Sequence, residues 1–185
     1  MTLWEIDIHP ATGEVDSAAL RVAAAARELG LADLGSAKDV QVAAARAFLV
    51  QAANLDRSRV ERLANELVGD LVVETPVVAE ICDAALVVAP DRLASKTAKG
   101  INAKGTCVTV LLKPGVMDPV AQSTLAAAAD LGVPLEAVST GRKYWFAGID
   151  DAAARRIGER LLANDAIEQV VVGPLPLKKL DLGRS

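Results

Sequence analysis

The order of predicted strands and helices occurs twice along this chain, and that repetition restricts the possible fold more than any other feature. Residues 3–8 alternate apolar and polar side chains as a strand does, and residues 16–29 have apolar side chains at helical spacing before Gly30. A β-rich segment (40–52), a second helix beginning near Asp56 and a closing β-rich run follow. The same order returns over residues 106–172.

The two predicted units also share residue types at corresponding places. The aligned residues are His9-Pro10 with Lys113-Pro114, Asp16 with Asp118, Leu29-Gly30 with Leu131-Gly132, Arg46 with Arg142, and Glu74 with Glu168. We therefore expect a first repeat over residues 1–79, an exposed connector over 80–105, a second repeat over 106–176 and a C-terminal tail over 177–185.

This order predicts an α+β fold built from two ferredoxin-like βαββαβ repeats with antiparallel sheets, provided that each middle stretch folds as two short paired strands. Successive apolar residues in those stretches, Phe48-Leu49-Val50 and Tyr144-Trp145-Phe146, indicate that both faces of the sheet are buried there. Helices cover one face, and the simplest cover for the second face is the other repeat. We therefore expect the repeats to pack as a pseudo-dimer, an arrangement that helices of one unit packing on the other unit's sheet would contradict.

Composition and charge exclude several classes of protein. Lys and Arg number 20 against 24 Asp and Glu, and the net charge of −4 argues against a general nucleic-acid binder. No apolar run reaches the roughly 18 residues needed to span a membrane, and Glu5 stands where a secretion signal needs a basic segment. Cys82 and Cys107 are isolated, which is typical of reduced thiols in a cytoplasmic protein.

The residues that carry chemistry in other proteins have structural interpretations here. His9, the single histidine, has no nucleophile motif beside it and is predicted to be structural. In residues 100–106, Lys104 precedes the last glycine and a strand follows, unlike a phosphate-binding loop. Asp150 and Asp151 are typical of a helix N-terminus. We expect no catalytic residue, no cofactor site and no metal site.

The second unit resembles the PurS family, the small subunit of phosphoribosylformylglycinamidine synthase in de novo purine biosynthesis. The resemblance depends on three motifs in register, in residues 112–119, 140–144 and 159–168, and covers residues 106–172. The first unit departs from the family pattern at residues 9–13 and 45–47. That departure predicts a mainly structural role for the first unit.

The resemblance implies an assembly subunit, or the N-terminal segment of a longer synthase, that is not catalytic alone. PurS-like subunits bridge an ATP-using synthetase subunit and a glutaminase subunit and are thought to assist ammonia transfer. The supported C–N ligase reaction converts formylglycinamide ribonucleotide, glutamine and ATP to the amidine, glutamate, ADP and phosphate. A cytoplasmic protein with these two partners, and without a nucleic-acid or membrane partner, is expected; further self-association stays open.

One constellation is a candidate partner interface, formed by Arg142, Lys143, Tyr144 and Trp145. Three of the chain's five aromatic residues are contiguous at 144–146, and Arg, Tyr and Trp are enriched at interface hot spots. Internal packing beside a solvated basic turn is the alternative for the same residues.

Two other functions share these sequence features. A tandem small-molecule regulatory module of the ACT type has the same βαββαβ order, although single glycines at 13 and 115 replace the Gly-rich turn expected there. An RNA-recognition sheet would display aromatic residues beside a basic strip, and the acidic balance of this chain argues against it.

Overall fold

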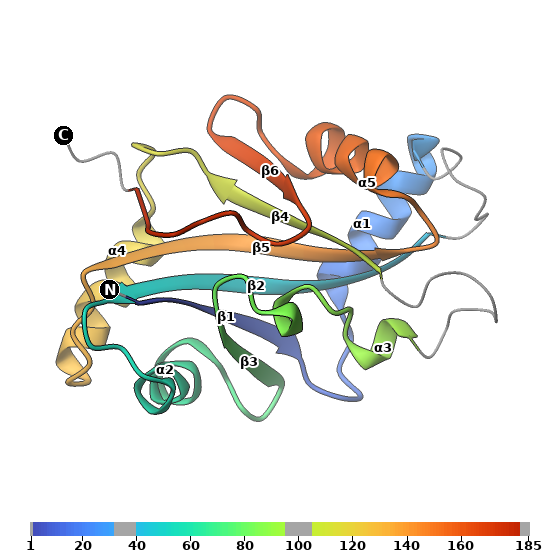
Figure 1. Cartoon of the computed structure of the whole chain (residues 1–185). Coiled ribbons are helices and arrows are strands. Elements are labelled where there is room, and N and C mark those ends of the chain that lie inside the picture. The colour runs from blue at the N-terminus through green and yellow to red at the C-terminus, as the bar shows by residue number, and fades with distance from the viewer. Residues whose placement is uncertain (1, 32–39, 95–104, 182–185) are drawn as a thin grey trace.

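The computed structural model describes residues 2–31, 40–94 and 105–181, and its strands form one six-stranded antiparallel sheet in the order β3-β1-β2-β5-β4-β6 (Figure 1). The first half contains β1 (Thr2–Pro10), α1 (Ser17–Glu28), β2 (Gln41–Ala52), α2 (Arg57–Leu63) with a π-helical turn η2 (Ala64–Val68), and β3 (Glu74–Glu80). The second half contains β4 (Thr106–Leu112), α4 (Pro119–Asp130), β5 (Ala137–Ala147), α5 (Asp151–Ile157) with a π-helical turn η4 (Gly158–Leu162), and β6 (Glu168–Val172). Between the halves lie a short 3-10 helix η3 (Ala84–Leu86) and α3 (Asp91–Ala94). The predicted α+β class with an antiparallel sheet is confirmed.

Each middle segment forms one long strand, so each half has the order βαβαβ and the expected two short strands are not formed. β2 and β5 pair with each other in antiparallel register, with Arg46 opposite Arg142. This pairing satisfies backbone N–H and C=O groups that would otherwise lie on exposed edges. The two halves therefore join edge to edge in one sheet, and the expectation that each repeat covers the second sheet face of the other is wrong.

The four longer helices α1, α2, α4 and α5 lie on one face of the sheet, and each half's core includes a helix of the other half. α4 packs with α2 over Trp4, Ile6 and Phe48 of the first half. α1 packs on β2 and beside η4, at the end of α5, and its buried residues belong to the cluster around Val108 and Phe146 of the second half (Figure 1). The line along which β2 pairs with β5 is called the seam here. Apolar side chains of α1 and α4 reach across it, which contradicts the expected arrangement in which each helix pair covers only its own sheet.

Aspartates fix the start of the helices as the sequence predicts. Asp16 accepts hydrogen bonds from the backbone N–H of Ala19 in α1 and of Ala44 in β2, at 2.9 and 2.8 Å. Asp118 accepts the corresponding bonds from Ala121 and Thr140. The second carboxylate oxygen thus attaches each helix N-terminus to a middle strand. Asp56 and Asp150 cap α2 and α5 in the ordinary way.

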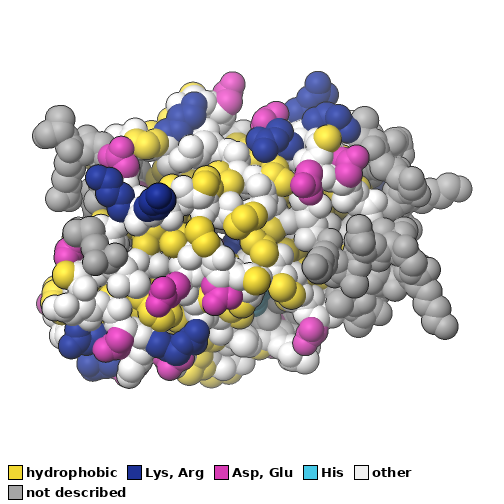
Figure 2. Space-filling model, in the orientation of Figure 1, with side chains coloured by type: hydrophobic (Ala, Val, Ile, Leu, Met, Phe, Trp, Pro, Cys, Tyr) yellow, Lys and Arg dark blue, Asp and Glu magenta, His cyan; other side chains and the backbone are white. Residues whose placement is uncertain are grey.

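The sheet face opposite these four helices is covered by two chain segments, one of which contains the short helices η3 and α3. Residues 81–94 and 173–180 cross this face (Figure 1) and bury a row of leucines and an alanine-rich surface around Trp145. Apolar side chains gather across the middle of the covered face in the space-filling view, with charged groups above and below (Figure 2). The prediction that both sheet faces are buried in the middle strands is confirmed by Phe146 on the helix-covered face and Trp145 on the opposite face, which are 0% and 1% exposed.

The segment expected to be an exposed connector thus takes part in the core. Leu86, Ala89 and Leu93 are buried, and residues 95–104 of this segment lie outside the described residues. Within the described ranges no helix is long and apolar enough to cross a membrane.

Candidate functional site

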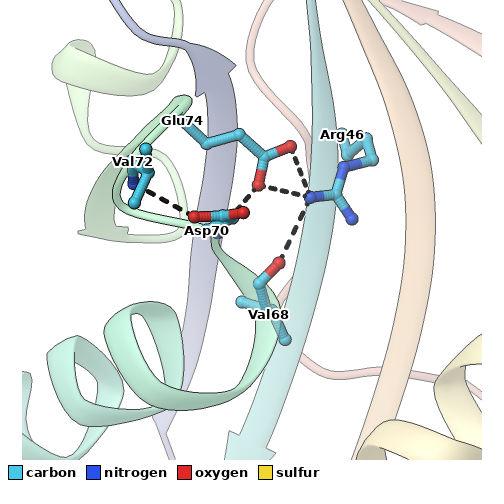
Figure 3. A network of polar contacts seen from close by, with 5 residues as sticks. All are labelled: Arg46, Val68, Asp70, Val72 and Glu74. Atoms are coloured by element: carbon cyan, nitrogen blue, oxygen red, sulfur yellow. Dashed lines mark hydrogen bonds and ion pairs between the residues drawn. The ribbon is translucent and has the colours of Figure 1, made fainter.

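A polar network holds the turn between η2 and β3 against the middle strand of the first half (Figure 3). The Arg46 Nη2 donates to both carboxylate oxygens of Glu74 at 2.7 and 2.8 Å and to the carbonyl of Val68 at 3.2 Å. Glu74 Oε2 also accepts from the backbone N–H of Asp70, and Asp70 Oδ1 accepts from the N–H of Val72. One arginine thereby fixes the end of the π-helical turn, the loop and the start of β3.

The second half contains the same network. Arg142 Nη2 donates to Glu168 Oε1 at 2.6 Å and to the carbonyl of Leu162 at 3.0 Å. Glu168 Oε2 accepts from the N–H of Asn164, whose side-chain oxygen accepts from the N–H of Ala166. Both arginines are about half exposed, and they lie opposite each other at the centre of the β2–β5 pairing.

The two turns held in this way differ in the side chains that they present. The first turn exposes Leu71, Val72 and Val73, of which Val72 is 85% exposed. In the second turn the corresponding residues are Asp165, Ala166 and Ile167. A rigid loop with adjacent exposed apolar side chains is a surface on which another protein can pack.

The opposite face of the sheet contains a buried charge cluster. Lys143 Nζ lies 2.6 Å from Glu5 Oε1 and 2.7 Å from Asp7 Oδ2, and all three side chains are nearly inaccessible. Lys143 is on β5, whereas both acids are on β1, so the lysine side chain crosses β2. It can do so because the β2 residues along its path on this face are alanines, Ala45 opposite Lys143 and Ala47 opposite Asp7.

Burial controls the electrostatics of this cluster. Loss of solvent, followed by the repulsion of Glu5, raises the pKa of Asp7 well above its usual range despite the nearby ammonium group. Burial alone would lower the pKa of Lys143, but the two carboxylates outweigh it and the pKa is raised. The two carboxylates therefore favour the charged form of the lysine, while burial favours the protonated form of Asp7.

The cluster is closed to solvent and to small molecules. Residues 82–87 and 173–175 cover Glu5 and Lys143 and leave no space for a water molecule beside them. Nearby on the same face, burial raises the pKa of the Cys107 thiol to about 12. Among the described residues no group of three His, Cys, Asp or Glu side chains could hold a metal ion.

An open cleft of about 810 Å³ lies at the end of β1. Its walls include His9, Thr75, Asp91 and Trp145, together with apolar residues of the segment 85–90. The His9 and Trp145 rings lie 5.1 Å apart, which places the histidine, only 7% exposed, against the indole at the strand end. The walls are largely apolar with a few polar groups, which is typical of small-molecule sites.

The four residues of the predicted partner interface are separated by the pleat of β5. Arg142 is exposed within the second polar network, and Tyr144 is buried on the helix-covered face. Lys143 and Trp145 are buried on the opposite face. Of the four side chains, Arg142 alone offers substantial surface to a partner, and the interface itself stays a prediction.

Sequence reasoning missed Glu5 and Asp7. Their alternation with Trp4 and Ile6 assigns them to one face of β1, and that face was expected to be the more solvated one. The described strands of the first half carry no Lys or Arg on that face, so two acids there are a signal for a partner lysine elsewhere, but period-2 alternation does not identify it. The predicted helix cap at Asp150 is confirmed, and residues 100–104 of the loop resembling a phosphate site lie outside the described residues.

Comparison with known proteins gives one family. Residues 106–173 match the PurS family model, which is described as phosphoribosylformylglycinamidine (FGAM) synthase. No curated protein matches the chain. The matched residues are β4, α4, β5, α5 and β6 with Gly173, and they include Arg142, Lys143 and Glu168.

Proposed function

Residues 106–173 belong to the PurS family of FGAM synthase of purine biosynthesis, and from this premise we propose that the chain is an assembly subunit, or the N-terminal segment, of that enzyme. In this proposal it is not catalytic alone. It bridges the synthetase and glutaminase parts and helps ammonia pass between them in the cytoplasm. The family match over residues 106–173 is the observation that carries the proposal.

We propose further that the first half is a second, diverged PurS-like unit, so that one polypeptide forms a pseudo-dimer. The matching order of elements, the paired aspartate caps at Asp16 and Asp118, and the two equivalent arginine networks support this interpretation. The central position of Arg46 opposite Arg142 also fits a local two-fold relation between β2 and β5.

The geometry of the described residues favours a structural role over a catalytic one. The ionisable cluster of Glu5, Asp7 and Lys143 is sealed from solvent, so it cannot reach a substrate. The two turns fixed by arginine are exposed, and the first of them presents Leu71 and Val72 to solvent. We propose this first turn, together with Arg142, as the surface that contacts a partner subunit.

A reconstitution assay tests the main proposal. The synthetase and glutaminase are assayed with and without this chain, using glutamine or ammonium chloride as the nitrogen source. We expect the chain to co-purify with both partners and to be needed for glutamine-dependent activity but not for ammonia-dependent activity. Full glutamine-dependent activity without the chain would overturn the proposal.

Matched substitutions test the contact surface. Val72→Asp places a charge on the exposed first turn, and Ala166→Asp makes the same change at the corresponding place of the second turn. We expect Val72→Asp to weaken binding of the partner about tenfold or more, because an apolar contact residue would be replaced by a charge, while Ala166→Asp has little effect. Arg142→Glu is the corresponding test for the arginine, and unchanged binding by all three variants would remove this surface.

A small-molecule regulatory module of the ACT type is the second candidate, favoured by the open cleft beside His9 and Trp145. Isothermal calorimetry with glutamine and other amino acids separates the two functions. Micromolar binding that is lost in Trp145→Ala, with the fold retained, would favour the regulatory module over the assembly subunit.

A further inference from the structure

The buried charge cluster occurs at one of two corresponding places in the sheet. The register places Asp7 opposite Ala47, next to Arg46, and Thr109 opposite Lys143, next to Arg142. By the same register Cys107 takes the place of Glu5. The second half thus holds the lysine without the acids, and the first half holds the acids without the lysine.

This asymmetry affects which strands can pair across the seam. If two first halves paired through β2, Ala47 would stand where Lys143 now stands, and four buried carboxylates would have no cation. If two second halves paired through β5, two buried lysines would lie near Cys107 and Thr109 with no carboxylate. Removing one partner from a buried ion pair is strongly destabilising because an uncompensated charge stays in the interior.

We infer that the cluster of Lys143, Glu5 and Asp7 determines the pairing partner: β2 of a first half accepts β5 of a second half and rejects another β2. This inference rests on the proposal that the two halves are related PurS-like units, each able to offer a middle strand for pairing. It goes beyond that proposal because it assigns the specificity to three named side chains. A pair of two first halves or of two second halves would bury charges without a partner and would be destabilised. Selective interfaces commonly use such a destabilising element against unwanted partners.

The two arginines at the centre of the seam do not distinguish the alternatives. Arg46 and Arg142 make equivalent bonds within their own halves, to Glu74 and Glu168, and these bonds would persist in any pairing. The alanines of β2 also leave space for the lysine without selecting it. Among the charged groups at the centre of the seam, discrimination therefore depends on the cluster.

The test uses the whole chain with a protease site inserted between residues 94 and 105, cleaved after folding so that both halves are present in equal amounts. The cleaved protein is unfolded in urea and refolded, and native mass spectrometry separates the three possible pairs by mass. We expect the parent to form mainly the mixed pair of one first half and one second half. Pairs of two identical halves (homopairs) should be at least about tenfold less abundant than in a statistical mixture. A statistical mixture from the parent would by itself overturn the inference.

Neutralising the cluster shows whether these three residues are responsible. In Glu5→Gln/Asp7→Asn/Lys143→Met we expect the homopair fraction to rise about tenfold toward the statistical value, whereas Arg46→Met/Arg142→Met keeps the selectivity of the parent. Selectivity retained in the neutral variant would overturn the inference. Should that variant fail to fold before cleavage, Lys143→Gln with the same two amides retains hydrogen-bonding groups and gives the same comparison. The reconstitution assay is independent of this result, so failure of the pairing rule and failure of the assembly function are distinguishable.

Discussion

On the helix-covered face, Arg46 with Glu74 and Arg142 with Glu168 fix equivalent turns in the two halves, whereas on the opposite face β1 carries Glu5 and Asp7 where β4 carries Cys107 and Thr109. The contrast separates two requirements. Each half needs its own turn from the π-helical end into the last strand, so that network is present twice. Joining the halves needs one charge cluster, which is divided between them.

The largest effect is expected from Lys143→Met. The change leaves Glu5 and Asp7 buried without their cation, and breaking a buried ion pair from one side costs about 3–5 kcal/mol. Urea unfolding monitored by tryptophan fluorescence measures the loss. Adding Glu5→Gln and Asp7→Asn should recover most of it, and a loss below about 1 kcal/mol in the single variant would contradict the importance of the cluster.

The next effect concerns pH. The pKa of Asp7 is higher in the folded state than its ordinary value of 3.8, so the folded state binds this proton more tightly. Its contribution to stability is fully present below the unfolded pKa and is lost as the pH rises through the folded pKa, at up to about 1.4 kcal/mol per pH unit. Unfolding free energies measured from pH 4 upward should fall less steeply in Asp7→Asn than in the parent. Thr109→Asn, at the corresponding place in β4, should keep the slope of the parent.

A smaller and equal effect is expected at the two matched networks. Glu74→Gln and Glu168→Gln each weaken a charge-assisted pair with a half-exposed arginine, which should lower the free energy of unfolding by about 1 kcal/mol. The same urea measurement checks both variants. Losses that differ by more than about 1 kcal/mol would show that the two turns are not equivalent.

The smallest effect concerns the thiol that replaces Glu5 in the second half. Burial and a pKa of about 12 keep Cys107 protonated, so we expect iodoacetamide at pH 8 to leave it unmodified in the folded protein, while the exposed Cys82 reacts. Peptide mass mapping after alkylation reads both sites, with Cys82→Ser as control. Labelling of Cys107 at the rate of Cys82 would show that the covered sheet face opens readily.

The sequence predicts the elements better than their partners. Asp16 and Asp118 mark helix starts through short-range spacing, and those places agree with the structure. The bonds from Arg46 to Glu74 and from Arg142 to Glu168 join residues 28 and 26 positions apart, and they were not predicted. The joining of β2 to β5 was missed because alternation indicates which residues share a face, not which strand lies alongside. For the same reason the face of β1 that carries Glu5 and Asp7 was expected to be exposed to solvent, although residues 81–94 and 173–180 cover it.

The exchange of helices across the seam has a consequence for synthesis on the ribosome. The apolar surface of β1 and β2 and the inner side of α2 are made early, but α4, which completes their core, ends only at Asp130. α1 packs on β2, but the rest of its core cluster comes from β4, β5 and α5, which are made later than α1 itself. A nascent chain that has reached only β3 therefore holds an unfinished core and a helix without its full binding surface, so the two halves complete their folding only after the strands and helices of the second half have been made.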